Sequence, residues 1–297
     1  MPDPIIGHHQ VADTNAVRIL RPLNVQPGPV EGATFEGAHT GIVVDVETTG
    51  LNPKEDKLIE LALRRFRYTS EGAITHLGQS YSWLEDPGFA LTPEIRNLTR
   101  LTDADLVGQR IDDQLASMLL NSANLVIAHN ARFDRQWVEQ RLPGVSGKEW
   151  ACSMAQVDWP ALGFDGCKLG HLLMQMGNYH SGHRAAADVD ATIRILMYRS
   201  EDGTTALARL LEASDRPSWI VQAHGTPFSA KDLLRGRKYQ WDVKLKLWWR
   251  EVTDAERMEE EWWLASHVYA SSDSWNPFGP KFIEVTAATR FLPQKQG

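Results

Sequence analysis

The chain has 297 residues, of which 42% are hydrophobic and 23% charged, as in a globular protein with one large domain or two ordinary ones. No apolar run approaches the roughly 20 residues of a membrane-spanning helix, and two cysteines are too few for a disulfide framework or a zinc cluster. A net charge of −7 argues against a general coat of basic surface. The first residues lack the pattern of a secretion signal, so we expect a cytoplasmic protein with no membrane partner.

The first part of the chain, residues 1–38, is rich in proline, glycine and polar residues. We expect an extended lead-in there, with one short strand at residues 16–20. From residue 39 to residue 205, segments with strand and helix patterns follow one another, which predicts a single α/β domain. Strands are expected at residues 41–47, 57–69, 75–85 and 124–130, and helices after Thr92 and Thr102 and at 112–123, 131–142, 168–177 and 183–200.

The last part, residues 215–297, holds seven of the eleven tryptophans. Its pattern predicts strands at 219–223, 239–251 and 281–286 and helices at 229–235 and 254–269, enough for a small α+β module. Basic and aromatic residues interleave between residues 231 and 250. Basic groups can follow phosphates and aromatic rings can stack on bases, so nucleic-acid binding is the leading interpretation. Protein docking and a purely structural role remain open.

Two acidic residues in the segment GIVVDVETTGL carry the first functional signal. Asp45 and Glu47 are two positions apart on the predicted strand, so their side chains point to the same face. Like charges this close repel, and their burial without a partner costs several kcal/mol each. A bound cation would explain the pair.

Two further acidic residues and a histidine extend this signal. Asp134 follows the segment AHNARF near a predicted helix start, and Asp188 ends the segment HRAAAD, five residues after His183. Carboxylate oxygens are ligands that suit Mg²⁺ or Mn²⁺ rather than zinc. Two such ions can stabilise the attacking and the leaving oxygen of a phosphoryl displacement.

The segments DVETTGL, AHNARFD and HRAAAD resemble the three motifs of the DEDD exonucleases, in the subgroup with a catalytic histidine. This superfamily includes the proofreading epsilon subunit of bacterial DNA polymerase III, ribonuclease T and oligoribonuclease. The resemblance covers roughly residues 40–200. It implies an RNase H-like α/β fold, with a mixed five-stranded sheet flanked by helices.

The resemblance also implies a role for each residue of the motifs. Asp45 corresponds to the carboxylate that bridges two Mg²⁺ or Mn²⁺ ions per active site, and Glu47 and Asp188 to ligands of the ion that activates water. Asp134 corresponds to the residue that holds the second ion. His183 corresponds to the general base, and an ordinary histidine pKa near 6.5 suits that work at neutral pH.

The choice of histidine rests on spacing. His180 lies only three residues before His183 and is the competing candidate, but the five-residue spacing to Asp188 favours His183. The sister subgroup has a tyrosine at the position of Arg184, so the histidine subgroup is indicated. Substrate-binding residues implied by the resemblance are Thr48, Thr49, Leu51, Asn130 and Phe133.

Together these observations predict a metal-dependent 3′→5′ exonuclease that releases nucleoside 5′-monophosphates from single-stranded 3′ ends. DNA is the favoured substrate, in proofreading or repair with a possible polymerase or repair partner. An RNA-trimming exonuclease is the first alternative. The second is an inactive exonuclease fold that serves as a polymerase-binding module, which the intact set of acids argues against.

Overall fold

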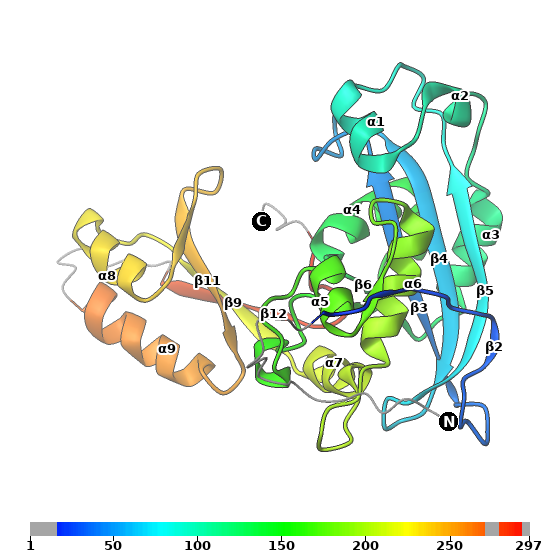
Figure 1. The fold of residues 1–297 in the computed structure, drawn as a ribbon. Coiled ribbons are helices and arrows are strands. Elements are labelled where there is room, and N and C mark those ends of the chain that lie inside the picture. Colours follow the sequence, from blue (N-terminus) through cyan, green and yellow to red (C-terminus); the bar gives the residue numbers. More distant parts are fainter. Residues whose placement is uncertain (1–16, 271–278, 293–297) are drawn as a thin grey trace. The chain divides into compact units, whose positions relative to one another are not determined.

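The computed structural model describes residues 17–270 and 279–292 (Figure 1). The chain divides into two compact units, residues 1–213 and residues 214–297. Among the described residues, none of the helices has both the length and the apolar character needed to cross a bilayer.

The described part of the lead-in forms two very short strands, β1 (Arg21–Pro22) and β2 (Gly28–Pro29). β1 pairs in parallel with β8 (Asn178–Tyr179). The strand expected at residues 16–20 is therefore wrong: residue 16 lies outside the described residues, and residues 17–20 are irregular. Val17 and Ile19 are 85% and 78% exposed, so the apolar residues of this segment are not buried against another element.

A six-stranded mixed sheet forms the centre of the first unit, in the order β2-β5-β4-β3-β6-β7. The antiparallel strands β3 (His39–Thr48), β4 (Leu58–Tyr68) and β5 (Ile74–Leu84) are followed by β6 (Leu125–Ala128) and β7 (Trp150–Cys152), which run parallel to β3. The expected five-stranded sheet is thus present. The sixth strand is β2, whose two residues pair with the outer edge of β5.

Helices cover this sheet. They are α1 (Pro93–Thr99), α2 (Asp103–Leu106), α3 (Asp113–Asn121), α4 (Ala131–Arg141), α5 (Leu169–Gln175), α6 (Ala185–Leu196) and α7 (Ala206–Asp215), with the short helices η1 (Pro143–Val145) and η2 (Pro160–Leu162). The predicted caps are confirmed: the hydroxyl of Thr92 accepts a hydrogen bond from the N–H of Ile95, and Thr102 forms a capping box with Asp105.

Helices α5, α6 and α7 pack on one face of the sheet (Figure 1). Their buried side chains, such as Val189 and Leu207, join Val43 and Phe66 of the sheet in one hydrophobic cluster. Helix α7 was missed by the sequence interpretation, which predicted no element at residues 206–214, between its two domains. The hydroxyl of Thr205 donates to the carbonyl of Gly72 at 2.7 Å and ties the start of α7 to the loop between β4 and β5.

The second unit contains an antiparallel sheet in the order β10-β11-β9-β12. Its elements are β9 (Ser218–Ala223), η3 (Phe228–Ala230), α8 (Lys231–Gly236), β10 (Gln240–Asp242), β11 (Leu247–Thr253), α9 (Arg257–Leu264), the π-helical turn η4 (Ala265–Tyr269) and β12 (Pro280–Val285). Its core includes Trp248 and Leu264.

One strand expected in this unit, at residues 239–251, is wrong. The segment is a hairpin, in which β10 pairs with β11 and Trp241 faces Trp248. The carboxylate of Asp242 accepts hydrogen bonds from the N–H groups of Lys244 and Leu245, and Lys246 adopts a left-handed conformation with φ of 52°. These local interactions reverse the chain where the side-chain pattern alone suggested continuous extension.

Candidate active site

Three carboxylates come together at the edge where β3 meets α6. Oxygen atoms of Asp45, Glu47 and Asp188 all lie within 4.8 Å of one another. Asp45 and Glu47 belong to β3, and Asp188 lies in the first turn of α6. The structure therefore brings together three of the four acids that the sequence singled out, from positions far apart along the chain.

The strand period explains this placement. Val43, Asp45 and Glu47 alternate along β3, so they share a face, and Val43 packs in the cluster formed with α6. Helix α6 crosses this same face and directs its N-terminal end toward the two acids. The positive end of the helix dipole favours a negative charge at Asp188.

Asp134 approaches the same region from the first turn of α4. Its side chain is buried, with 3% of the residue exposed, and its Oδ1 accepts a hydrogen bond of 3.1 Å from the N–H of Val46, which lies between the two acids of β3. Asp134 is not one of the three closely grouped acids. Its repulsion nevertheless contributes to the raised pKa of Asp45, so the four carboxylates share one electrostatic environment.

Burial and mutual repulsion disfavour the ionised forms of these acids. Burial, followed by the charges of Asp134 and Asp188, raises the pKa of Asp45 well above its ordinary value. Burial, followed by repulsion from Asp188, raises the pKa of Glu47 to about 8. Burial also raises the pKa of Asp134 to about 7, against the opposing effect of its backbone hydrogen bonds. A nearby cation would therefore favour the ionised forms of Asp45, Glu47 and Asp134.

The donor set fits a hard divalent cation. The grouped ligand atoms are carboxylate oxygens, and cysteine sulfur is absent from them. Oxygen-rich sites suit Mg²⁺ and Mn²⁺, and the raised pKa values show that these side chains gain from a nearby positive charge.

The two competing histidines take different positions beside Asp188. The Nε2 atom of His180 lies 2.7 Å from Oδ1 of Asp188, and its side chain is 9% exposed. His183 has an exposed side chain, and its backbone N–H donates to Oδ2 of Asp188 at 2.8 Å. Its φ of 64° is left-handed, a conformation that strains a residue other than glycine by roughly 1 kcal/mol. The structure thus places His180 against the acid and leaves the imidazole of His183 free to face solvent.

A fifth buried acid, Glu60, was missed by the sequence interpretation. It lies on β4 directly opposite Glu47 and is 1% exposed. Nε of Arg184 donates to it at 3.2 Å, the N–H of Ala185 at 3.3 Å, and the hydroxyl of Ser82 at 3.0 Å. Glu60 therefore anchors the start of α6 to the sheet. An acid inside the apolar run LIELAL was the available signal.

The turn after β3 is closed by its own hydrogen bonds. The hydroxyl of Thr48 donates to the carbonyl of Gly50 at 2.6 Å, and the hydroxyl of Thr49 accepts from the N–H of Lys57 at 2.9 Å. A Cβ atom at Gly50 would lie too close to the carboxylate of Asp56 for normal packing, so a larger residue there would require that side chain to move. Leu51, at the tip, is 82% exposed. The turn is therefore a fixed loop that presents one apolar side chain to solvent.

The two remaining candidates flank the start of α4. Asn130 is exposed and occupies the cap position without a side-chain cap bond. Phe133 is half-buried, with its ring centroid 5.9 Å from that of Trp137. Both residues lie at the N-terminal end of α4, close to Asp134 in the sequence.

Comparison with known proteins decides the family. A family model described as Exonuclease (RNase T type) matches residues 42–196, which is more than half of the chain and includes all the acids described above. The chain belongs to the exonuclease family. It is a hydrolase of the 3′→5′ class that the three motifs indicated.

Relatives of this exonuclease include two bacterial proteins named DNA polymerase III subunit epsilon. The protein from Treponema pallidum is 29% identical over 153 residues, covering 48% of this chain and 68% of the relative. The protein from Aquifex aeolicus is 27% identical over 205 residues, covering 67% of this chain and 91% of the relative. Matches to DNA polymerase III of the PolC type, such as that of Clostridium perfringens at 31% identity, span only 11% of the relative.

Among solved structures, the exonuclease is similar to E. coli exonuclease I in complex with single-stranded DNA. The match has a TM-score of 0.47 and 16% identity, and covers 73% of this chain and 63% of the other. The fold assignment depends on the family model and on the mixed sheet rather than on this likeness.

Proposed function

We propose that this exonuclease removes nucleoside 5′-monophosphates from single-stranded 3′ ends, with DNA as the favoured substrate and two Mg²⁺ or Mn²⁺ ions in the active site. The observation that carries the proposal is the grouping of three carboxylates within 4.8 Å, with the pKa of Glu47 raised to about 8. Buried and half-buried acids this close together destabilise the fold when ionised, because each one repels the others. They fit a site for cations.

In this proposal Asp45, Glu47 and Asp188 would hold the ion that activates the water, and Asp45 and Asp134 would hold the other. When bound, such ions supply charge stabilisation to the attacking and leaving oxygens of the phosphodiester. The hydrogen bond from the N–H of Val46 orients Asp134.

His183 is the proposed general base. A base must reach the water near the scissile phosphate, and the exposed imidazole of His183 is free to do so, while its backbone is held by Asp188. His180 instead contacts Asp188 with its side chain, which suits a residue that positions this ligand.

The terminal nucleotide is proposed to lie against the turn after β3. Leu51 is the exposed apolar side chain that can pack against the last base, and the closed turn at Thr48 and Thr49 keeps it in place. Asn130 and Phe133 are proposed to line the same groove from the start of α4.

A role in proofreading or repair in the cytoplasm, with a polymerase or repair partner, is part of the proposal. Its support is the similarity to proteins named as subunits of DNA polymerase III.

One assay tests the proposal. Labelled single-stranded DNA, single-stranded RNA and DNA duplexes with mismatched 3′ ends are incubated with the full chain, with EDTA or with Mn²⁺. We expect Mn²⁺-dependent release of 5′-monophosphates from the 3′ end, fastest on single-stranded DNA. Faster degradation of RNA would make the exonuclease an RNA-trimming one, and activity in EDTA would remove the metal from the mechanism.

A further inference from the structure

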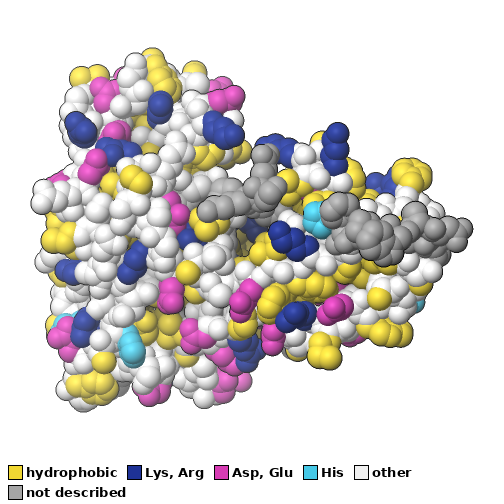
Figure 2. Space-filling model, turned by 180° about the vertical axis from the view of Figure 1, so that it is seen from behind, with side chains coloured by type: hydrophobic (Ala, Val, Ile, Leu, Met, Phe, Trp, Pro, Cys, Tyr) yellow, Lys and Arg dark blue, Asp and Glu magenta, His cyan; other side chains and the backbone are white. Residues whose placement is uncertain are grey.

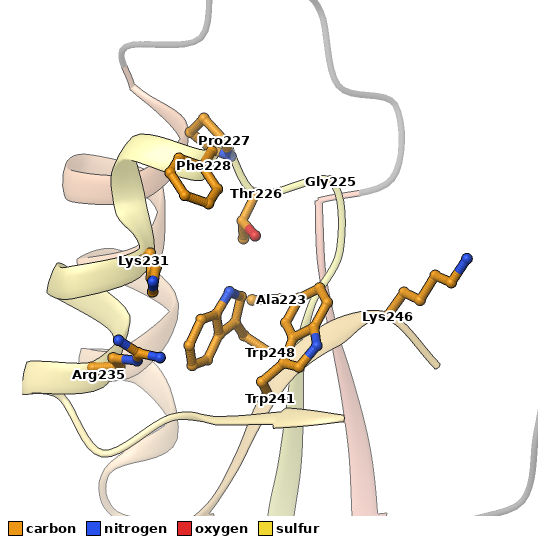
Figure 3. A pocket seen from close by; sticks show the side chains of 10 residues that line it. All are labelled: Ala223, Gly225, Thr226, Pro227, Phe228, Lys231, Arg235, Trp241, Lys246 and Trp248. Carbon is orange, nitrogen blue, oxygen red and sulfur yellow. The ribbon is translucent and has the colours of Figure 1, made fainter. Parts of the chain in front are cut away.

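The second unit has a pocket of about 390 Å³ between α8 and the β10–β11 hairpin (Figure 3). None of the active-site residues belongs to it. The side chains that define its character are three aromatic and three basic ones: Phe228, Lys231, Arg235, Trp241, Lys246 and Trp248.

Two of the three aromatic side chains of the pocket are much more exposed than core residues. Trp248 is 8% exposed and belongs to the core of the unit. Trp241 packs on it at 5.4 Å between ring centroids but is 47% exposed, and Phe228 is 87% exposed. Large apolar rings left in water around a hollow mark a binding site more often than a folding need. Trp248 is therefore a core residue, whereas Trp241 and Phe228 remain largely in water.

Among the described residues, the basic side chains of the pocket have no acidic partner. None of the described residues that line the pocket is acidic, and none of Lys231, Arg235 and Lys246 forms an ion pair with any residue that the structure describes. By contrast, Arg237 and Arg250 of the same unit both pair with the buried Glu260. The pocket therefore holds a local positive charge that none of its described neighbours pairs with.

Aromatic and basic groups are arranged together there. Lys231 lies 5.6 Å from the ring of Phe228, and Arg235 lies 5.9 Å from the ring of Trp248. Figure 3 shows both cations projecting from α8 on one side of the two indoles, with Lys246 on the other side. On the face that Figure 2 shows, basic and acidic side chains are interspersed, so the positive charge of the pocket is a local feature rather than part of a basic coat.

We propose that this pocket binds a nucleotide of a single-stranded nucleic acid, with its base stacked on Trp241 and Phe228 and its phosphates held by Lys231 and Arg235. Exposed aromatic rings and unpaired cations together suit a polynucleotide, because its bases can stack on the rings and its phosphates carry negative charge. The proposal rests on the proposed function, in which the bound strand is the substrate, but it concerns a separate site.

The lining also predicts how selective the pocket is. The described residues that line the pocket include no Asn, Gln, Asp or Glu to read base edges, and Thr226 supplies the one hydroxyl. Lys231 and Arg235, which could also read bases, are assigned to phosphates in this proposal. Binding should therefore depend little on sequence.

Strand binding by the full chain tests the proposal. The background variant is Asp45→Ala, so that the strand is not degraded, and the probe is a long fluorescein-labelled oligothymidylate followed by anisotropy at several salt concentrations. Trp241→Ala should weaken binding on the order of 5- to 100-fold, the range for one lost stacking platform. The double variant Lys231→Gln and Arg235→Gln should weaken binding and lower the salt slope by about 1.4, because each lost phosphate contact contributes about 0.7.

Matched controls come from the same unit. Trp262→Ala removes another tryptophan, 65% exposed and outside the pocket, and Lys244→Gln removes a lysine of the same hairpin that does not line it. Both should bind the strand as the background variant does. Circular dichroism and thermal unfolding confirm that each variant is folded.

Three outcomes overturn the proposal. If the folded pocket variants bind the strand with the same affinity and salt slope as the controls, the pocket does not bind nucleic acid and a protein partner becomes the alternative. Equal losses in Trp262→Ala and Trp241→Ala would mean that no particular pocket is involved. Tight binding of thymidine 5′-monophosphate with the same dependence on Trp241 would make the ligand a free nucleotide rather than a strand.

Cleavage of a dinucleotide by the otherwise wild-type chain separates this proposal from the proposed function. A dinucleotide is too short to occupy two separate sites, so its cleavage reports the active site. Absence of cleavage would refute the proposed function, whereas the anisotropy results decide on the pocket in either case.

Discussion

Replacing Glu47 by glutamine should stabilise the metal-free protein while weakening its response to metal. The amide has nearly the same shape as the carboxylate but carries no charge. In the absence of a cation, the ionised Glu47 faces Asp188, Glu60 and Asp134, and burial disfavours its charge further. Removing that charge relieves the repulsion, and it also removes one ligand of the proposed cation site.

The pKa of Glu47 gives the size of the effect. It is raised from 4.5 to about 8, and each tenfold change in proton affinity corresponds to about 1.4 kcal/mol. Because the folded-state pKa lies above the unfolded one, the destabilisation is absent below about pH 4.5, grows as pH rises and is complete above about pH 8. At pH 7 it amounts to about 3 kcal/mol.

Chemical denaturation between pH 4 and pH 8 in EDTA measures this difference. Glu47→Gln should be more stable than wild type by about 3 kcal/mol at pH 7, and the two should converge near pH 4. Adding Mn²⁺ at about a hundred times its Kd should stabilise wild type by about 2.7 kcal/mol and the variant by less. The control Glu149→Gln, at an exposed position, should match wild type throughout. Equal stability of wild type and Glu47→Gln at pH 8 in EDTA, or an equal response to Mn²⁺, would refute this account of the site.

Further predictions concern catalysis and the anchoring of α6. Asp45→Ala should abolish cleavage in a folded protein, so more than trace activity in the purified variant would contradict the metal site. His183→Ala should lower kcat on the order of 10²–10⁴-fold with little change in KM, whereas an equal loss in His180→Ala alone would move the base to that residue. A 3′-phosphorylated strand should resist digestion and a 5′-blocked strand should not; the reverse result, followed with end-labelled strands, would invert the polarity. Arg184→Ala should lower the free energy of unfolding by about 1–3 kcal/mol, because it leaves Glu60 buried without its cation, and unchanged stability in urea would show that the pair is dispensable.

Local sequence was enough to locate the acids of the proposed metal site. Asp45 and Glu47 stand on one strand, and Asp134 and Asp188 each follow a short recognisable segment near a helix start. Regular strand and helix patterns predicted the α/β class of the first domain, because a few neighbouring residues determine them. The mixed sheet was implied by the resemblance to the DEDD exonucleases.

Features that depend on residues far apart in the sequence were not predicted. Glu60 looked like an ordinary acid of a strand, because its partner Arg184 stands 124 positions later. The relation of His180 and His183 to Asp188 depends on the left-handed backbone at His183, which spacing along the chain does not reveal. The hairpin at β10 and β11 was hidden for another reason: alternating side chains in its turn mimic an extended strand.

The acids of the site lie in segments that are synthesised at different times. Strands β3 and β4 are synthesised early and can pair as a hairpin, which sets Glu47 beside Glu60. Helix α6 follows much later, and it brings both Asp188 and, just ahead of it, the counter-charge Arg184. A chain that ends before α6 therefore lacks Asp188 and Arg184 while keeping the repelling acids of β3 and β4. In the proposed mechanism such a chain lacks one of the metal ligands, and it should not degrade nucleic acid.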